Sequence, residues 1–206
     1  MDSKDLSTLN EIHTVAKKEF LEKGYAGASL RNIVRQAGMT TGAFYGYYDS
    51  KEELFGALVK EHYDHFLSMF RGAQGDFARI PSQEQPEKLA SISGDCMFEM
   101  LHYAYAHLEE FKLIICSSEG TRYHNLIDEM VDIETEATHA YIKVLEKLGQ
   151  PKPNIDPRLE HIIITGMFNT FVELIVHEMP VEEAEKYLAE MRAFYTAGWM
   201  KILGQR

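Results

Sequence analysis

The sequence has few of the features that would mark an exported protein or a membrane protein. Cys96 and Cys116 are its only two cysteines among 206 residues, and they form no CxxC pair. We predict that both are buried thiols of a cytosolic protein. No apolar run approaches the roughly 18 residues that span a bilayer, and the first residues carry no signal-peptide pattern. We therefore expect a soluble, cytoplasmic protein with no membrane partner.

Catalytic and metal-binding motifs are also scarce. The chain has no glycine-rich phosphate loop, no nucleophile elbow and no HExxH. Cys116 as a nucleophile with His124 or Glu134 as its partner is the catalytic alternative, and we predict that the protein is not an enzyme. Nine histidines suggest a metal hypothesis, with His62 and His65 three residues apart. Because no local His/Cys/carboxylate quartet has ligand spacing, we expect no metal and no cofactor.

The net charge of −11 is distributed unevenly along the chain. Residues 1–51 hold seven Lys and Arg against six Asp and Glu, whereas the remaining residues hold 14 against 26. An acidic body repels phosphate, so any contact with a nucleic acid is expected at the N-terminal end only. Hydrophobic residues make up 45% of the chain, which is enough for a real core, and no period-two strand pattern is present. The predicted fold class is all-α.

Capping signals near the N-terminus predict three helices. Thr8-x-x-Glu11 is a capping box that predicts the start of the first helix, and Gly24 predicts its end. Ser29 caps a second helix, which ends at Gly38, and a tight turn then leads into a short third helix. This order of helix, helix, turn and short helix is that of a helix-turn-helix.

The rest of the chain reads as further helices. Ser50-x-x-Glu53 predicts a fourth, longer helix that runs to about Arg71, directly after the short third one. Residues 72–86, rich in Gly, Pro and Gln, are the clearest predicted loop. Helical patterns then cover about 87–107, 108–118 and 121–148, a break follows at 149–153, and two more helices start at Asp156-Pro157 and after Pro180.

Residues 39–51, read as MTTGAFYGYYDSK, combine two threonines, two small residues and four aromatics. Thr40 or Thr41 is expected to cap the short helix, where free backbone N–H groups favour an anion. The small residues that follow let the backbone approach the floor of a groove. Phe44 and Tyr48 share one face and are expected to be buried, while the other two tyrosines keep free hydroxyls. This division of roles is that of a helix that reads DNA.

Four segments resemble the N-terminal domain of tetracycline-repressor (TetR) family regulators. They are residues 29–34 (SLRNIV), 37–39 (AGM), 41–45 (TGAFY) and 47–54 (YYDSKEEL). The resemblance implies a three-helix DNA-binding domain at 1–50. A long helix joins it to a larger ligand-binding and dimerisation domain at 51–206, with about nine helices in all. It further implies a homodimer that represses transcription from a near-palindromic operator in double-stranded DNA. An unidentified small-molecule effector releases it.

The resemblance also implies roles for single residues. The positions that match DNA contacts are Ser29, Arg31, Thr40, Thr41, Gly42, Ala43, Tyr45, Tyr47 and Lys51. Of these, residues 41–43 match base-facing positions, whereas the two tyrosines and the lysine match phosphate contacts. Small residues at the reading positions favour methyl contacts and DNA shape over bidentate base contacts. The alternative function is a helical protein-interaction module that does not bind DNA.

The last two predicted helices are apolar on more than one face, so each must be buried on more than one face. We expect them to form a four-helix bundle with the same two helices of a second copy. The alternative is that both helices lie wholly inside a monomer.

Glu134 stands on an otherwise apolar stripe of the helix predicted at 121–148. A carboxylate there is costly unless it is paired or lines a cavity, so one reading places Glu134 in a ligand pocket and the other at the edge of the stripe in water. On the first reading, the pocket is lined by Phe66, Met97, Leu101, Tyr105, Phe111, Tyr123, Ile127, Met130, Glu134, Met167, Phe168 and Phe171. Methionine-rich, aromatic linings suit an adaptable apolar cavity, although they also suit an ordinary core.

Overall fold

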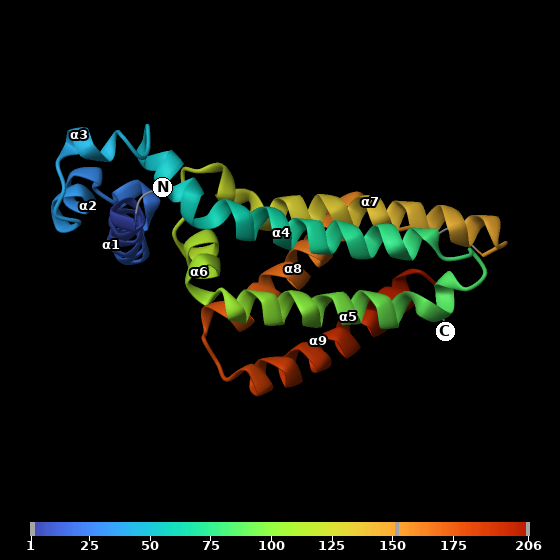
Figure 1. Cartoon of the computed structure of the whole chain (residues 1–206). Helices are drawn as coiled ribbons and strands as arrows, with labels where there is room; N and C mark the ends of the chain where they lie inside the picture. The colour runs from blue at the N-terminus through green and yellow to red at the C-terminus, as the bar shows by residue number, and fades with distance from the viewer. Residues whose placement is uncertain (1–2, 151–152, 205–206) are drawn as a thin grey trace. The chain divides into compact units, whose positions relative to one another are not determined.

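A computed structural model describes residues 3–150 and 153–204, and helices make up nearly all of this part of the chain (Figure 1). The α-helices are α1 (Ser3–Gly27), α2 (Leu30–Gln36), α3 (Thr41–Phe44), α4 (Lys51–Arg79), α5 (Gln85–Ala106), α6 (Leu108–Cys116), α7 (Leu126–Lys147), α8 (Pro157–Val176) and α9 (Val181–Ile202). A 3₁₀ turn, η1 (Arg122–Asn125), precedes α7. The described residues contain no strand, so the prediction of an all-α fold is confirmed.

The chain divides into two compact units. The first unit comprises Met1–Asp64 and His107–Asn125, and the second comprises His65–Ala106 and Leu126–Arg206. Helix α4 therefore contributes its first half to one unit and its second half to the other. This division differs from the predicted boundary after residue 50, because the beginning of α4, α6 and η1 complete the core around the first three helices.

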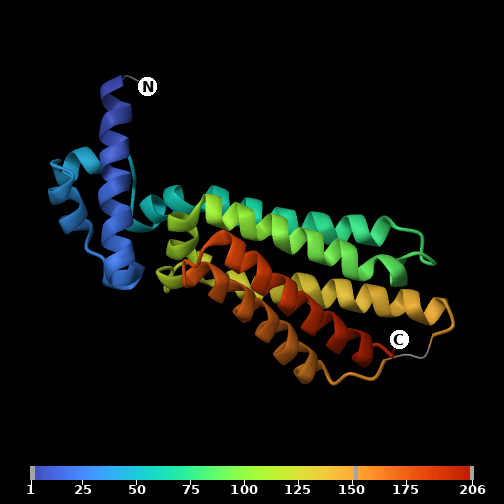
Figure 2. The same ribbon diagram turned by 90° about the horizontal axis from the view of Figure 1, so that it is seen from below.

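The first unit is built on α1, which packs against α2 and α6 (Figures 1 and 2). Its core is aromatic: Phe20 meets Phe55 edge to face at 5.0 Å between ring centroids, and Tyr123 lies 6.0 Å from Phe55. The predicted stop at Gly24 has a positive φ of 67°, a conformation that glycine adopts readily. The predicted start at Thr8 was wrong. Helix α1 begins at Ser3. The carboxylate of Asp5, in its first turn, interacts favourably with the positive end of the helix dipole.

The caps of the helix-turn-helix form as predicted. The Ser29 hydroxyl accepts a hydrogen bond from Asn32 N at 3.3 Å, and the Thr40 hydroxyl accepts one from Ala43 N at 3.1 Å. Gly38, between α2 and α3, has a φ of 65°. Glycine adopts this left-handed conformation at little cost and is therefore the usual residue at the end of a helix. Local sequence therefore determines this part of the fold.

The second unit is a bundle in which α7 packs against α8, and α9 packs against both α5 and α8 (Figures 1 and 2). Asp156 caps α8 as predicted, since its side chain accepts from Arg158 N at 2.8 Å. Helix α8 is long and apolar enough to cross a membrane by length and composition alone, although the same test is passed by the core helix of a soluble protein. Its residues Ile164, Phe168 and Phe171 are fully buried within the unit. Pro151 and Lys152 of the predicted break lie outside the described residues.

Helix α4 is longer than predicted, because the expected loop at 72–86 is helical as far as Arg79. Two glycines within this stretch, Gly72 and Gly75, each disfavour a helix by about 1 kcal/mol relative to alanine. Packing offsets that cost: Phe77 is buried and meets Tyr141 of α7 edge to face at 5.5 Å. Only residues 80–84 remain as the connection to α5.

Candidate nucleic-acid interface and ligand cavity

One surface of the first unit is formed by the start of α2 and by α3. Ser29, Arg31, Thr40, Thr41, Gly42, Ala43 and Tyr45 are all exposed, and Tyr47 is half-buried. As predicted, Phe44 and Tyr48 are buried instead, with 0% and 8% of their surface exposed. The structure therefore brings eight of the nine residues predicted to contact DNA onto accessible surface.

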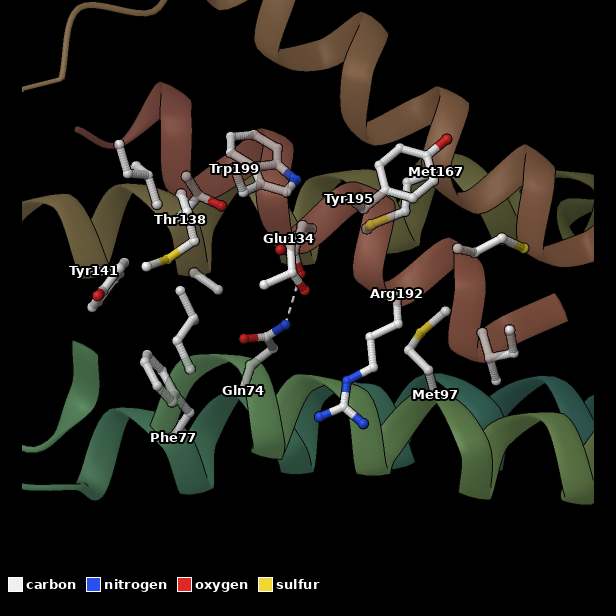
Figure 3. A pocket seen from close by; sticks show the side chains of 17 residues that line it. Gln74, Phe77, Met97, Glu134, Thr138, Tyr141, Met167, Arg192, Tyr195 and Trp199 are labelled. Carbon is white, nitrogen blue, oxygen red and sulfur yellow. Dashed lines mark hydrogen bonds between the residues drawn. The ribbon is translucent and has the colours of Figure 1, made fainter. Parts of the chain in front are cut away.

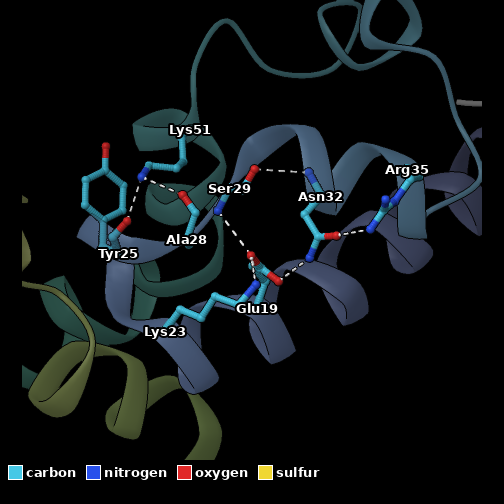
Figure 4. Close-up of polar contacts among 8 residues, drawn as sticks. All are labelled: Glu19, Lys23, Tyr25, Ala28, Ser29, Asn32, Arg35 and Lys51. Atoms are coloured by element: carbon cyan, nitrogen blue, oxygen red, sulfur yellow. Dashed lines mark hydrogen bonds and ion pairs between the residues drawn. The ribbon is translucent and has the colours of Figure 1, made fainter.

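The ninth, Lys51, is already engaged within the protein. Its Nζ donates to the backbone oxygens of Tyr25 at 2.6 Å and Ala28 at 3.0 Å, and lies 4.4 Å from the centre of the Tyr25 ring. Burial lowers the pKa of Lys51. An ammonium group has three donors, so these two bonds leave one for a phosphate. Lys51 thus joins the start of α4 to the connection between α1 and α2 (Figure 4).

Sequence reasoning missed Glu19, which organises the start of α2 (Figure 4). Its carboxylate is almost fully buried and accepts from Lys23 Nζ at 2.7 Å, Ser29 N at 3.1 Å and Asn32 Nδ2 at 2.6 Å. The hydrogen bond from Lys23 is the main cause that lowers the pKa of Glu19, while burial opposes it. Asn32 in turn accepts from Arg35 Nη2 at 2.7 Å. A charged residue on the buried side of α1 was the available signal.

A second link holds α1 to the end of the helix-turn-helix. His13 of α1 shares a short hydrogen bond with the hydroxyl of Tyr48. This bond gives the hydroxyl of the buried tyrosine a polar partner. Burial lowers the pKa of His13 and raises that of Tyr48. Both groups are therefore neutral near pH 7, so this hydrogen bond introduces no buried charge.

The second unit contains a cavity of about 120 Å³ between α4, α5, α7, α8 and α9 (Figure 3). It is lined by Gln74, Phe77, Leu89, Met97, Glu134, Ala137, Thr138, Tyr141, Met167, Leu188, Met191, Arg192, Tyr195, Thr196, Trp199, Met200 and Leu203. Most of these side chains are apolar or aromatic. The polar side chains of the cavity include Arg192 and Glu134, and Glu134 Oε2 accepts from Gln74 Nε2 at 2.7 Å.

Three of the twelve residues predicted for the pocket line this cavity: Met97, Glu134 and Met167. The structure does not place the other nine around it. Phe66, Leu101, Met130, Phe168 and Phe171 are fully buried in the packing of the second unit, and Ile127 is half-buried on α7. Tyr105 donates its hydroxyl to Leu174 O at 2.8 Å, whereas Phe111 and Tyr123 belong to the first unit.

Half of the fourteen lining residues that the sequence prediction missed come from α9. The prediction gave α9 more than one apolar face without saying which residues belong to which, and in the structure Leu188, Met191, Tyr195 and Trp199 form the face that lines the cavity. Spacing of three and four residues along α9 separates this face from the outer one, and that separation was the available signal. Trp199 also brings a polar atom to the cavity lining, because its Nε1 is buried without a hydrogen-bond partner among the described residues.

Glu134 combines burial with a single neutral partner. Burial raises the pKa of its carboxyl to about 7, and the hydrogen bond from Gln74 opposes that rise. Near pH 7 the group therefore exists in both forms, so it can accept from a donor or donate to an acceptor. The reading that left Glu134 at the edge of its stripe in bulk water does not fit this position.

The two cysteine thiols differ in their exposure to solvent. Cys96 is buried, and burial raises its pKa to about 11, so it is an inert core residue as predicted. Cys116 is exposed, contrary to the prediction of a buried thiol, because it is the last residue of α6. The proposed catalytic partner Glu134 lies in the other unit.

Comparison with known proteins agrees with the fold and with the exposed surface, which together define a helix-turn-helix protein. Residues 12–58 match the family described as bacterial regulatory proteins, tetR family. The chain is 34% identical over 61 residues to the uncharacterized HTH-type transcriptional regulator YdgC of Bacillus subtilis, covering 30% of this chain and 31% of that protein. It is 24% identical over 153 residues to the HTH-type transcriptional repressor KstR2 of Rhodococcus jostii, covering 72% and 70%.

The fold is also similar to that of a solved protein. A member of the TetR transcriptional regulator family from Streptomyces coelicolor A3 superposes with a TM-score of 0.57 at 14% identity, over 89% of this chain and 88% of that one. The N-terminal part of the chain, residues 12–58, is that of the tetR family of bacterial regulatory proteins. The match to YdgC covers less than a third of that protein, so the shared sequence is chiefly that of the helix-turn-helix.

Proposed function

We propose that the protein is a homodimeric transcriptional repressor that binds a near-palindromic operator and leaves it when a small molecule occupies the cavity of the second unit. The observation that carries the proposal is the exposed surface of α2 and α3. Its backbone is fixed from behind by Glu19, Lys51 and the two helix caps, while its threonines, small residues and Tyr45 remain accessible. A preorganised surface of this kind suits groove contact. A DNA-binding regulator of this kind acts in the cytoplasm.

The proposed DNA contacts divide into two kinds. Arg31, Thr41, Gly42 and Ala43 face the bases, whereas hydroxyls such as that of Tyr45, which is 52% exposed, reach phosphates. Few charged groups lie on this surface, so non-specific affinity is expected to be modest and to fall steeply with salt. The remaining residues are acidic and repel DNA, so DNA is expected to approach the protein at this end only.

The proposed effector is an apolar molecule that carries at least one hydrogen-bonding group. The support is the composition of the cavity: its walls are methionine, leucine and aromatic side chains, and its polar groups are few. Glu134 can exchange its bond from Gln74 for one from the effector, and the indole N–H of Trp199 can donate to an effector oxygen. Such pockets orient ligands through a small number of polar contacts.

The proposed dimer forms through the outer faces of α8 and α9. Four of the seven large hydrophobic residues that are exposed among the described residues lie on these two helices: Leu159, Ile162, Tyr187 and Phe194. Phe194 is 74% exposed and Ile162 64%. Apolar surface concentrated in this way is typical of an interface. Two copies would place two recognition surfaces on one operator.

Operator selection tests this function directly. The untagged chain is used to select fragments from a random DNA pool, and affinity for the selected site is measured at several salt concentrations. Tyr45→Phe should weaken binding by roughly 1 kcal/mol, the scale of one hydrogen bond. Arg31→Ala should weaken it further and relax sequence preference.

Arg158→Ala, an exposed arginine of the second unit, is the matched control and should bind as wild type does. Selection of no sequence would favour the alternative of a protein-interaction module. Equal binding by all three variants would instead show that the assigned DNA-contact residues are wrong.

A further inference from the structure

Two histidines and a glutamate gather in the first unit, away from the surface of α2 and α3. His62 lies on α4, His107 is the N-cap residue of α6, and Glu110 lies in the first turn of α6. One ring nitrogen from each histidine and one carboxylate oxygen all lie within 4.8 Å of one another. The two imidazole rings are 4.3 Å apart between centroids. All three side chains are half-buried, so an ion from solvent can reach them.

This set of donors is one that transition metals prefer. Two imidazoles and a carboxylate, with a position left for water, form a common zinc site. Metal–ligand bonds of about 2.0–2.1 Å would place ligand atoms about 3.3 Å apart in a tetrahedron. The three ligand atoms lie within 4.8 Å of one another, so rotation of the side chains can bring them to that spacing.

Lys17 of α1 occupies the place of a cation in this cluster. Its Nζ is paired with the Glu110 carboxylate and lies 3.3 Å from Oε2 of Glu109, which is 68% exposed. A divalent ion attracts Glu110 more strongly than a single ammonium does. Lys17 can then keep its pair with Glu109 alone. The two adjacent glutamates thus allow the cluster to exchange one cation for another without leaving a buried charge unpaired.

We propose that His62, His107 and Glu110 form a binding site for a divalent transition-metal ion of the zinc class. The ion joins α4 to α6 within the first unit and competes with Lys17 of α1 for Glu110. Water fills the remaining coordination position. The site shares no residue with the DNA-contacting surface or with the cavity of the second unit, so it adds a ligand class that the proposed repressor function does not require.

Cobalt serves as the probe, because tetrahedral Co²⁺ absorbs visible light far more strongly than the hexaaqua ion. The untagged chain, treated with a chelator and dialysed, is titrated with CoCl₂ at pH 7.5. Wild type should develop an intense band that saturates at one Co²⁺ per chain and disappears when ZnCl₂ is added. His62→Ala and His107→Ala should each weaken Co²⁺ binding about tenfold or more, as the loss of a ligand predicts.

His65→Ala is the matched control, since His65 lies on α4 three residues from His62, where its ring contacts Tyr103 at 4.5 Å instead. This variant should bind Co²⁺ as wild type does. Lys17→Met should bind Co²⁺ more tightly, because the competing ammonium is gone. Circular dichroism verifies that each variant is folded.

A measurement on the wild type keeps the test independent of folding. ZnCl₂ should shift the ring ¹⁵N resonances of His62 and His107 and leave those of His65 in place. The proposal is overturned if wild type shows no intense Co²⁺ band, if zinc leaves both rings unshifted, or if His65→Ala weakens binding as much as His62→Ala does.

Discussion

Gln74 of α4 donates a 2.7 Å hydrogen bond from Nε2 to Oε2 of Glu134 on α7, and both side chains line the same cavity (Figure 3). This bond joins the helix that follows the helix-turn-helix to the helix that carries the partly buried carboxyl. A neutral amide compensates a buried carboxylate only in part, so the protein retains an electrostatic cost at this position. A buried carboxyl with a perturbed pKa, such as that of Glu134, is therefore a candidate for contact with a ligand.

The first prediction concerns Glu134 and pH. Its pKa is about 7 in the folded protein against an ordinary value of 4.5, so between these values the folded state binds more protons than the unfolded state. Stability therefore falls as pH rises through this window, by an amount on the order of 2 kcal/mol. Glu134→Gln should remove that fall. Urea unfolding at pH 5 and pH 8 should show little difference at pH 5 and a more stable variant at pH 8.

Glu136→Gln, on the exposed side of the same helix, is the control and should follow wild type at both pH values. A Glu134→Gln variant that is less stable than wild type at pH 8 would contradict the cost assigned to the carboxylate.

The second prediction tests Glu19 as the residue that positions Ser29. Glu19→Gln keeps the size of the side chain but turns an amide N–H₂ toward one of three donors, Lys23, Ser29 N or Asn32. The unfolding free energy at pH 7 should fall by about 1–3 kcal/mol. Because the pKa of Glu19 is lowered in the folded state, its contribution is present above pH 4.5 and is lost as pH falls through the lowered value.

The difference between wild type and Glu19→Gln should therefore narrow below about pH 4. Operator affinity at pH 7 should fall as well, although Glu19 does not contact DNA. Glu22→Gln, exposed on the same helix, should change neither property. Equal operator affinity for wild type and Glu19→Gln would show that the start of α2 is held in place without this carboxylate.

The third prediction concerns the dimer. Phe171 is fully buried within its own unit and Trp199 lines the cavity, so substitutions there would disturb the fold before any interface. Phe194→Glu and Ile162→Glu, at exposed positions of α9 and α8, should instead give folded monomers. Sedimentation equilibrium at micromolar concentration measures the mass, and circular dichroism measures helix content.

Leu6→Glu, on α1 and 49% exposed, is the control and should remain dimeric. A wild type that sediments as a monomer would exclude the proposed interface.

The helix-turn-helix was predictable because its determinants are local. Ser29, Gly38 and Thr40 act on neighbouring backbone groups, and the aromatics of residues 44–48 are buried or accessible according to their spacing. These features depend on a few residues at fixed spacing, so a single sequence contains them.

The cavity was not predictable in the same way. Its walls come from five helices, and whether an apolar residue lines a cavity or fills the core depends on small differences in packing between helices. Phe66 and Phe77 illustrate the point: both are buried on α4, yet Phe66 packs near Phe171 at 6.3 Å between centroids while Phe77 borders the cavity. Residues 72–79 were predicted as a loop because the low helix propensity of glycine can be read from the sequence. The packing of Phe77, which stabilises the helix there, cannot be read from it.

The last prediction concerns the switch. Helix α4 is continuous from Lys51 to Arg79; its start is bonded to the α1–α2 connection through Lys51, and its later turns carry Gln74 into the cavity. An effector that takes over the bond between Gln74 and Glu134 changes what α4 contacts, and packed helices respond by moving as blocks. An allosteric coupling of about 1–3 kcal/mol would weaken operator binding roughly 5- to 150-fold.

An apolar effector is first identified by its effect on the thermal stability of the protein. Its affinity is then measured with and without saturating operator, and the two dissociation constants should differ by the factor by which the effector weakens operator binding. Gln74→Ala should leave effector-free operator affinity nearly intact and reduce this factor. Gln83→Ala, in the exposed connection to α5, is the matched control and should preserve it. If the effector binds equally well with and without operator, the cavity and the helix-turn-helix are not coupled, because linkage requires the effect to be reciprocal.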